Sequence, residues 1–299
     1  MAEALVIETA NLRKVYGGVE AVRGLNLQVP AASIFALLGR NGAGKTSTIK
    51  ILLGMSRPTS GHVSVFGLAA DSPDASVAIR RRTGFVSEEK DLYDSMTVEQ
   101  IIRFTATFYP KWRNDLEQGY FRSFGLPRGR RVKDLSRGMR TKLALLLAFS
   151  CGAELLVLDE PTSGLDPAAT EEVLHALIAH VASQEMTVFL SSHRLSDVDQ
   201  VADRIAILDR GRAVVSGALD DLREAYRRVQ LVFDGDAPEP SFRAPGVVHA
   251  ERRGRVLSVL CSRDVKQLLD EVRALNAVSV DVMRVTLKEI FLETVNGEN

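Results

Sequence analysis

Cysteine and long apolar runs are both scarce in this sequence of 299 residues. The two cysteines, Cys151 and Cys261, lie far apart in apolar surroundings, which favours buried, reduced thiols in a cytosolic protein. The longest apolar stretch, Leu143–Leu158, is interrupted by Gly152 and Glu154. We interpret it as the end of a helix followed by a buried strand, because a membrane span needs about 20 apolar residues. If the protein works at a membrane, another polypeptide must cross it.

An excess of charge of either sign is also absent. The sequence has 38 Lys and Arg residues against 38 Asp and Glu residues, for a formal net charge of zero, so no global field favours nucleic acid. Metal-ligand pairs are missing among the five histidines: His175 and His180 are five positions apart and do not share a helix face. A hydrophobic content of 45% and a charged content of 25% are those of an ordinary globular protein.

Apolar runs alternate with helical patterns over most of the chain. Residues 4–9 and 22–29 alternate as exposed strands do, with a loop containing Tyr16-Gly17-Gly18 between them. Uninterrupted apolar runs predict central strands of a parallel sheet at Ile34–Leu38, Leu155–Leu158, Val188–Ser191 and Ile205–Leu208. Helical patterns occur at 45–54, 169–183 and 196–202. This succession predicts an α/β layered domain with crossover helices.

Two regions depart from that alternation. Between about 90 and 150, helical patterns at 97–109, 113–124 and 138–150 replace the strand signals and indicate a helical insertion. Beyond residue 226, a small α+β lobe is predicted from a strand at 229–233, a hairpin within 247–261, a helix at 263–275, a strand at 278–285 and a helix at 287–295. We therefore expect one domain at 1–226 and a second at 227–299.

Residues 39–46 read Gly-Arg-Asn-Gly-Ala-Gly-Lys-Thr and stand between a predicted strand and a predicted helix. Glycines let successive N–H groups point at phosphate oxygens, and the helix N-terminus adds a favourable dipole. This pattern is a Walker A loop, in which Lys45 reaches the β- and γ-phosphates and the Thr46 hydroxyl binds Mg²⁺. A glycine-rich turn that only separates two elements is the alternative. The predicted nucleotide contacts are Gly39, Asn41, Gly42, Ala43, Gly44, Lys45, Thr46 and Ser47.

Two acids, Asp159 and Glu160, directly follow the apolar run Leu155–Leu158. A buried strand delivers these carboxylates to the edge of the sheet where the phosphate loop also opens. Asp159 is placed to hold Mg²⁺ through water, and Glu160 is placed to orient and polarise the water that attacks the γ-phosphate. A strand that merely ends in polar residues is the alternative, and the Walker A loop upstream weighs against it.

Further motifs follow in order: Leu135-Ser136-Arg137-Gly138-Met139, Ser163-Gly164-Leu165-Asp166 and Ser191-Ser192-His193. With the two nucleotide motifs, they resemble the signature, D-loop and switch histidine of the nucleotide-binding subunits of ATP-binding cassette (ABC) transporters. The resemblance covers about residues 5–225. It implies a P-loop cassette with a parallel-sheet core, an antiparallel β subdomain and a helical subdomain at about 90–150.

The resemblance implies that the ligands are ATP and Mg²⁺ and that two subunits share each active site. In the family, Ser136 and Gly138 would cap the γ-phosphate held by the opposing subunit, and Asp166 would join them in nucleotide binding. Their place before a helix fits such contacts, although serine also favours an ordinary N-cap. His193 would contact the γ-phosphate and act with the hydrolytic carboxylate. Tyr16 would either stack on adenine or only pack on its own loop.

Two departures from the family pattern stand out. Glu88 occupies the position of the Q-loop glutamine; it can still reach metal-bound water, but it adds a charge. We expect Glu88 to share Mg²⁺ binding with Thr46 and Asp159. Arg137 and Met139 replace a glycine and a glutamine of the signature. Because Ser136 and Gly138 are kept, an active ATPase is predicted.

The resemblance also implies partners: a separate transmembrane permease, and a second ATP-binding subunit in a homodimer or heterodimer. Residues 88–112, including Phe108–Trp112, would form the groove that receives a short helix of the permease, unless these aromatic side chains pack within the insertion. The lobe, with its ending Thr286–Phe291, resembles the extension of subunits paired with bacterial ABC-2, or export-type, permeases; it would regulate, add dimer contacts or only stabilise. The implied place is the cytoplasmic face of the cell membrane. The alternatives are a cassette ATPase not linked to transport and a non-catalytic module that binds ATP.

Overall fold

The computed structural model describes residues 4–184 and 186–296. These residues form two compact units, which divide between Ala213 and Val214, within β10 (Arg212–Ala218). The boundary expected from the sequence, at 226/227, lies further along the chain, at the start of β11 (Arg227–Val232). Among the described residues, no helix combines the length and the apolar character that crossing a bilayer requires.

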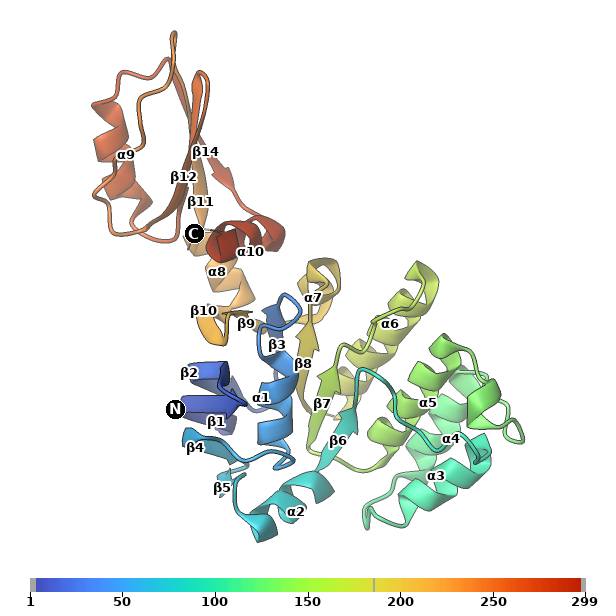
Figure 1. Ribbon diagram of the computed structural model, residues 1–299. Helices are drawn as coiled ribbons and strands as arrows, with labels where there is room; N and C mark the ends of the chain where they lie inside the picture. The colour runs from blue at the N-terminus through green and yellow to red at the C-terminus, as the bar shows by residue number, and fades with distance from the viewer. Residues whose placement is uncertain (1–3, 185, 297–299) are drawn as a thin grey trace. The chain divides into compact units, whose positions relative to one another are not determined.

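The centre of the first unit is a six-stranded sheet of order β10-β9-β3-β8-β7-β6, in which the last five strands pair in parallel (Figure 1). Its strands from β3 on are β3 (Ile34–Gly39), β6 (Thr83–Val86), β7 (Leu155–Asp159), β8 (Thr187–Ser192) and β9 (Arg204–Asp209). Every residue of β3, β7 and β8 is buried. Burial on both faces explains their uninterrupted apolar sequences, and the predicted parallel sheet is confirmed.

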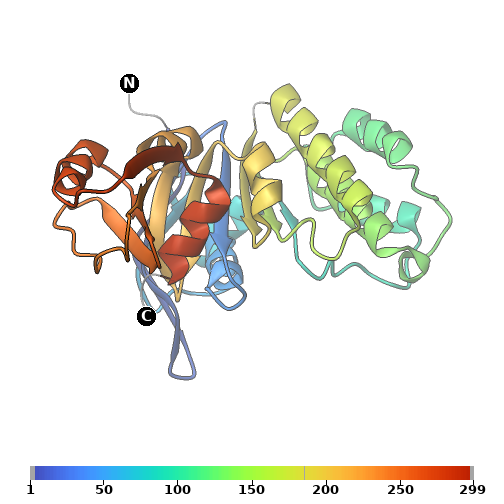
Figure 2. The same ribbon diagram turned by 90° about the horizontal axis from the view of Figure 1, so that it is seen from above.

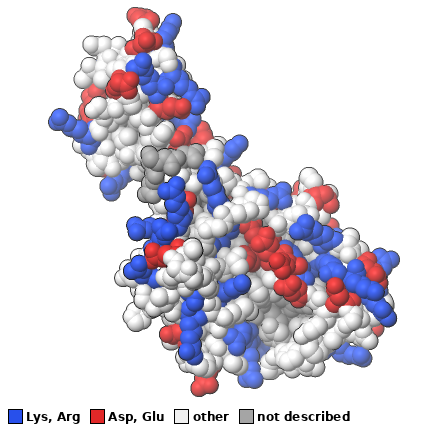
Figure 3. All heavy atoms as spheres, in the orientation of Figure 1, with Lys and Arg blue, Asp and Glu red and all other residues white. Residues whose placement is uncertain are grey.

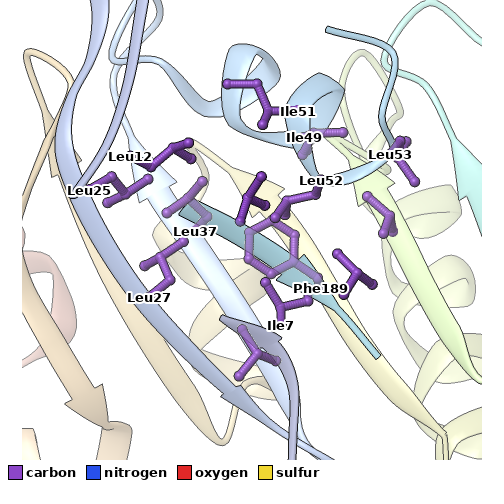
Figure 4. Packing of buried hydrophobic residues seen from close by; sticks show 14 of the residues in the cluster. Ile7, Leu12, Leu25, Leu27, Leu37, Ile49, Ile51, Leu52, Leu53 and Phe189 are labelled. Atoms are coloured by element: carbon purple, nitrogen blue, oxygen red, sulfur yellow. The ribbon is translucent and has the colours of Figure 1, made fainter. Parts of the chain in front are cut away.

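An antiparallel sheet of order β2-β1-β4-β5 forms a second layer. Its strands are β1 (Leu5–Tyr16), β2 (Val19–Pro30), β4 (Ser60–Val65) and β5 (Leu68–Ala69). The first two are longer than the sequence predicts, because the hairpin turns within only two residues, Gly17 and Gly18, which both have positive φ. Helix α1 (Lys45–Leu52) packs between the layers, and Figure 4 shows its Ile49 and Leu52 among side chains of both sheets.

A helical insertion separates β6 from β7. It consists of α3 (Val98–Ala106), α4 (Asn114–Ser123), a short 3₁₀ turn (Val132–Asp134) and α5 (Arg137–Ser150). The predicted helix at 97–109 is too long: α3 ends at Ala106, where the Thr107 hydroxyl donates to the carbonyl of Phe104. The predicted helix at 138–150 begins one residue earlier, because Ser136 caps it.

The remaining helices of the first unit are α2 (Pro73–Arg81), α6 (Pro167–Gln184) and α7 (Leu195–Val201). Seen from above in Figure 2, the helices of the insertion and α6 form a group beside the strands. No element between the end of α1 and the helical insertion is predicted from the sequence. In the structure this segment contains β4, β5, α2 and β6, which are short and mix polar with apolar residues.

The second unit contains α8 (Leu219–Ala225) and a four-stranded antiparallel sheet of order β12-β13-β11-β14. Helix α9 (Val265–Arg273) covers the sheet with Leu268 and Val272. The predicted hairpin is β12 (Val247–Arg253) with β13 (Val256–Cys261), and the last elements are β14 (Ser279–Arg284) and α10 (Leu287–Asn296).

Candidate active site

The phosphate loop connects β3 to α1, and close packing explains its glycines. A Cβ on Gly39 would lie 2.7 Å from the carbonyl oxygen of Leu208, and a Cβ on Gly44 would lie 2.3 Å from that of Ala21. Gly44, with φ +107°, is the N-cap of α1, and no side chain caps this helix. Its first N–H groups are therefore left for a ligand.

Residues 40–47 line a hollow of about 390 Å³ together with Ala21, Glu88 and Glu160. The structure thus brings every predicted Walker A contact to one place except Gly39, which ends β3 and packs against β9. Lys45 is only 6% exposed. Its ammonium group donates to the carbonyl of Gly39 (2.8 Å) and lies 3.1 Å from Oε1 of Glu160.

The two acids that follow β7 differ in their partners. Asp159 is buried, and its carboxylate accepts a short hydrogen bond from the Ser191 hydroxyl of the neighbouring strand β8. Glu160 is buried as well, in the left-handed conformation with φ +47°. Its backbone N–H donates to the carbonyl of Ser191 (3.2 Å). Ser191 therefore fixes both acids, a role that the sequence analysis does not assign.

His193 lies against the carboxylate of Glu160. Its Nδ1 is 2.8 Å from Oε2 of Glu160, and its backbone N–H also donates to this oxygen (3.3 Å). Because an ionised carboxylate only accepts hydrogen bonds, a protonated Nδ1 would donate to it in this arrangement. Lys45 and His193 thus approach opposite oxygens of one buried carboxylate. The structure places the two residues predicted to be catalytic, Glu160 and His193, next to each other.

The three predicted Mg²⁺ ligands, Thr46, Glu88 and Asp159, line a second hollow of about 620 Å³. A hydroxyl and two carboxylates are hard oxygen donors of the kind that Mg²⁺ prefers. The described residues contain no group of three His, Cys, Asp or Glu side chains that would hold a metal by themselves. Mg²⁺ usually takes one or two protein carboxylates and completes its shell with phosphate and water.

Lys90, which the sequence analysis does not single out, is 5% exposed. Its ammonium group donates to the carbonyl of Glu88 (2.9 Å) and to that of Glu160 (3.0 Å). Burial lowers the pKa of Lys90 to about 8; the negative charge of Glu88 raises it, and the positive charge of Arg137 lowers it further. The available signal was a lone lysine within the acidic run 88–91.

The signature residues lie away from the phosphate loop. The Ser136 hydroxyl accepts the Met139 N–H (3.3 Å) as the N-cap of α5, and a Cβ on Gly138 would meet only Ala169, at 3.8 Å. Neither residue lines the hollow of about 390 Å³. The guanidinium of Arg137 lies against Gly164, where a Cβ would come within 2.1 Å of its Nη1.

Asp166 and Tyr16 also lie outside the hollow around the phosphate loop. The Asp166 carboxylate accepts the N–H of Ala169 (3.0 Å) and so caps the start of α6. Tyr16 is 43% exposed at the end of β1, with the Lys14 ammonium 4.7 Å from its ring centroid. Its ring therefore has surface left for an adenine.

The hollow of about 620 Å³ continues from the Mg²⁺ ligands into an apolar groove. The groove is lined by α1, α3, α5 and the segment 85–93, with Met55, Tyr93, Phe104 and Tyr109 among its large side chains. Of the predicted aromatic run only Tyr109 lines it. Trp112 instead donates its indole N–H to Glu117 (2.8 Å) within the insertion.

On the face seen in Figure 3, charges of both signs are interleaved, with an acidic group gathered on the first unit.

Comparisons with known proteins agree with this geometry. Residues 22–163 match the family model described as ABC transporter. The chain is 26% identical over 293 residues to the ABC transporter ATP-binding protein YtrB of Bacillus subtilis (strain 168), covering 98% of this chain and 99% of that protein. It is 36% identical over 225 residues to the daunorubicin/doxorubicin resistance ATP-binding protein DrrA of Streptomyces peucetius, covering 73% of this chain and 67% of that protein.

A solved structure of an ATP-binding subunit of an ABC transporter superposes with a TM-score of 0.66 at 30% identity, covering 74% of this chain and 92% of that one. The predicted P-loop cassette fold is thereby confirmed. The chain belongs to the ATP-binding subunits of ABC transporters, the ATPases that dimerise, work with transmembrane components and energise transport.

Proposed function

We propose that this chain binds Mg-ATP between two subunits and hydrolyses it with Glu160. The observation that carries the proposal is the buried carboxylate of Glu160, which Lys45 approaches at 3.1 Å and His193 at 2.8 Å. An ionised carboxylate held at the mouth of a phosphate loop can accept a hydrogen bond from a water and aim it at the γ-phosphate.

The other residues of the site have supporting roles in this proposal. The backbone of residues 41–47 would surround the phosphates, and Thr46, Glu88 and Asp159 would hold Mg²⁺. When bound, Mg²⁺ would neutralise phosphate charge and polarise the bond to the leaving group. Ser191 keeps Asp159 in place through its hydroxyl.

Lys45 has two competing partners. Its ammonium group pairs with Oε1 of Glu160, and the phosphate oxygens of bound ATP would compete for the same group. When Lys45 turns to the phosphates, one carboxylate oxygen of Glu160 becomes free to accept a hydrogen bond from the attacking water. ATP binding and preparation of the hydrolytic carboxylate are thereby one event.

We propose a second ATP-binding subunit, identical or related, as the partner that supplies Ser136 and Gly138. Neither residue lines the chain's own phosphate-loop hollow, which supports this arrangement. A separate permease would seat a short helix in the apolar groove, which places the chain on the cytoplasmic face of the membrane. The resistance named for DrrA supports export as the direction of transport.

The test is Glu160→Gln in the full-length chain. The variant keeps the size of the side chain but removes the charge that activates water. We expect ATP binding to be retained, dimers to accumulate in Mg-ATP and hydrolysis to fall by at least about 100-fold. Glu171→Gln, an exposed change on α6, is the matched control and keeps the parental rate. A Glu160→Gln protein that hydrolyses ATP at the parental rate refutes this role.

A further inference from the structure

Lys90 places a buried cation behind the hydrolytic carboxylate. Two of its three ammonium donors reach backbone carbonyls, at Glu88 (2.9 Å) and at Glu160 (3.0 Å). Within the described part of the chain Lys90 forms no ion pair with a carboxylate, although Glu88, Asp159 and Glu160 are near enough to act on its charge. Burying a lysine costs free energy unless its donors are used, so this placement needs a reason.

The carbonyl that Lys90 holds belongs to a strained turn. Glu160 has φ +47°, a conformation that non-glycine residues rarely adopt. Its carbonyl accepts both the Lys90 ammonium (3.0 Å) and the N–H of Ser163 (3.1 Å). The bond from Lys90 therefore fixes the peptide plane that follows Glu160 and limits how the side chain of Glu160 is directed.

The same lysine belongs to the segment that a permease would touch. Residues 85–93, Lys90 included, line the hollow that contains the apolar groove, whereas Lys90 does not line the phosphate-loop hollow. Lys90 is itself in the left-handed conformation, with φ +51°. A movement of this segment would carry the ammonium group away from the carbonyl of Glu160, since one side chain joins the two.

We propose that Lys90 is a positioning residue for ATP hydrolysis, which holds the backbone of Glu160 and links it to the segment 88–91 of the groove. This inference rests on the proposed role of Glu160 as the hydrolytic carboxylate. Lys90 acts on the hydrolytic step, not on nucleotide binding, because its two bonds go to backbone carbonyls outside the phosphate loop.

The test compares Lys90→Met with the full-length parent in steady-state ATPase assays. Methionine keeps the length and the apolar stem but has no donor. We expect kcat to fall about tenfold while KM for ATP and the dissociation constant of a fluorescent ATP analogue stay within about twofold. Lys142→Met, which removes a half-buried lysine paired with Glu172 (2.7 Å), is the control and keeps the parental kcat.

A double-mutant cycle separates positioning from a general loss of structure. If Lys90 acts through Glu160, then Lys90→Met adds no further loss of kcat in a Glu160→Gln background. Equal fold losses in both backgrounds overturn the proposal, as does an unchanged kcat. Lys90→Gln, which retains one donor group, should lose less activity than Lys90→Met; loss of nucleotide binding in both variants would assign Lys90 to folding instead and overturn the proposal.

The outcomes also separate this inference from the proposed function. A parent protein that does not depend on Glu160 for hydrolysis contradicts the proposed function. A parent that loses activity on Glu160→Gln but not on Lys90→Met contradicts only the role of Lys90.

Discussion

Glu160 is buried among a lysine, a histidine and a strained turn, and each neighbour limits what its carboxylate can do. The Lys45 ammonium group lies 3.1 Å from one of its oxygens. His193 occupies the other oxygen. Because the two oxygens of this carboxylate have unlike neighbours, its side chain has one preferred orientation beside the phosphate loop.

Glu88→Gln tests the departure from the family pattern at the Mg²⁺ site. Glutamine keeps the size but removes a charge from the group formed with Thr46 and Asp159. Because a carboxylate is a stronger ligand for Mg²⁺ than an amide, we expect the Mg²⁺ concentration for half-maximal ATPase activity to rise by about threefold or more. The measurement is a Mg²⁺ titration of the rate at saturating ATP.

Glu89→Gln is the control for that titration. Glu89 is the next acid along the chain and lines only the larger hollow, not the phosphate-loop hollow. Its replacement should leave the Mg²⁺ dependence unchanged. If both variants raise the Mg²⁺ requirement equally, the two glutamates act only through their negative charge, and Glu88 is not a ligand of Mg²⁺.

At this scale, the sequence predicts residues within contiguous motifs and misses those defined by pairing between distant segments. Lys45, Thr46, Asp159 and Glu160 are identifiable because their neighbours in sequence are also their neighbours in the site. Ser191 acts on Asp159 through the register of two parallel strands. No local sequence pattern predicts that register or the contact of Lys90 with Glu160.

At the scale of elements, β6 lies so close to α5 that Gly84 cannot carry a side chain. A Cβ there would lie 2.6 Å from the carbonyl oxygen of Ala148 and 2.7 Å from Cδ2 of Leu156. We expect Gly84→Ala to lower the free energy of unfolding by about 2 kcal/mol, because the strand or the helix must shift. Chemical denaturation of the full chain measures this change.

Gly119→Ala is the matched comparison in α4. A Cβ at Gly119 meets nothing within 4 Å, and alanine favours a helix over glycine by about 1 kcal/mol. The same substitution should therefore raise the free energy of unfolding here. If both substitutions change the free energy of unfolding in the same direction, the packing argument for Gly84 is contradicted.

His180 on α6 couples the stability of the insertion to pH. It is fully buried, stacks on Phe149 at 4.1 Å between ring centroids and lies 3.0 Å from the Tyr120 hydroxyl through Nδ1. Burial, aided by Arg113, lowers the pKa of His180 to about 4. Below pH 6.5 the unfolded chain binds the proton more tightly than the folded one, so acid destabilises the fold.

The expected loss between pH 7 and pH 5 is about 2 kcal/mol of unfolding free energy from this group alone. His180→Phe removes the titrating group and keeps a ring that can stack. Its unfolding free energy should fall less between pH 7 and pH 5 than that of the parent. The other histidines are the same in both proteins and contribute equally to the two pH profiles. Parallel pH profiles for the two proteins would show that His180 is not the source.

The elements that the sequence predicts best are the buried parallel strands and the amphipathic helices, whose periods are long enough to recognise. The elements β4, β5 and α2 are missed because they gain their form from packing on other layers rather than from their own pattern. The strand β6 is missed because it has only four residues. The predicted end of α3 is wrong for a different reason. A side-chain hydroxyl at Thr107 ends the helix before Pro110 does.

At the scale of the whole molecule, one chain holds two half-sites that do not meet. The phosphate-loop hollow includes Lys45 and Glu160, whereas Ser136 and Gly138 lie outside it. The N-terminus of α5 has its cap in place and little around Gly138, so it is available to an external phosphate. A twofold dimer would bring each half-site to the other, since an isologous interface presents the same surfaces twice.

Ser136→Glu in a Glu160→Gln background tests this division. A carboxylate at the N-terminus of α5 would repel the γ-phosphate of the opposing subunit. We expect the double variant to remain monomeric in Mg-ATP by light scattering, while each chain binds nucleotide with an affinity within about twofold of the Glu160→Gln parent. Ser72→Glu makes the same change at the N-cap of α2 and should leave the dimer intact. If the double variant forms dimers as readily as the Glu160→Gln parent, Ser136 is not part of the interface. If the monomer binds nucleotide about tenfold more weakly, Ser136 belongs to the nucleotide site of its own subunit.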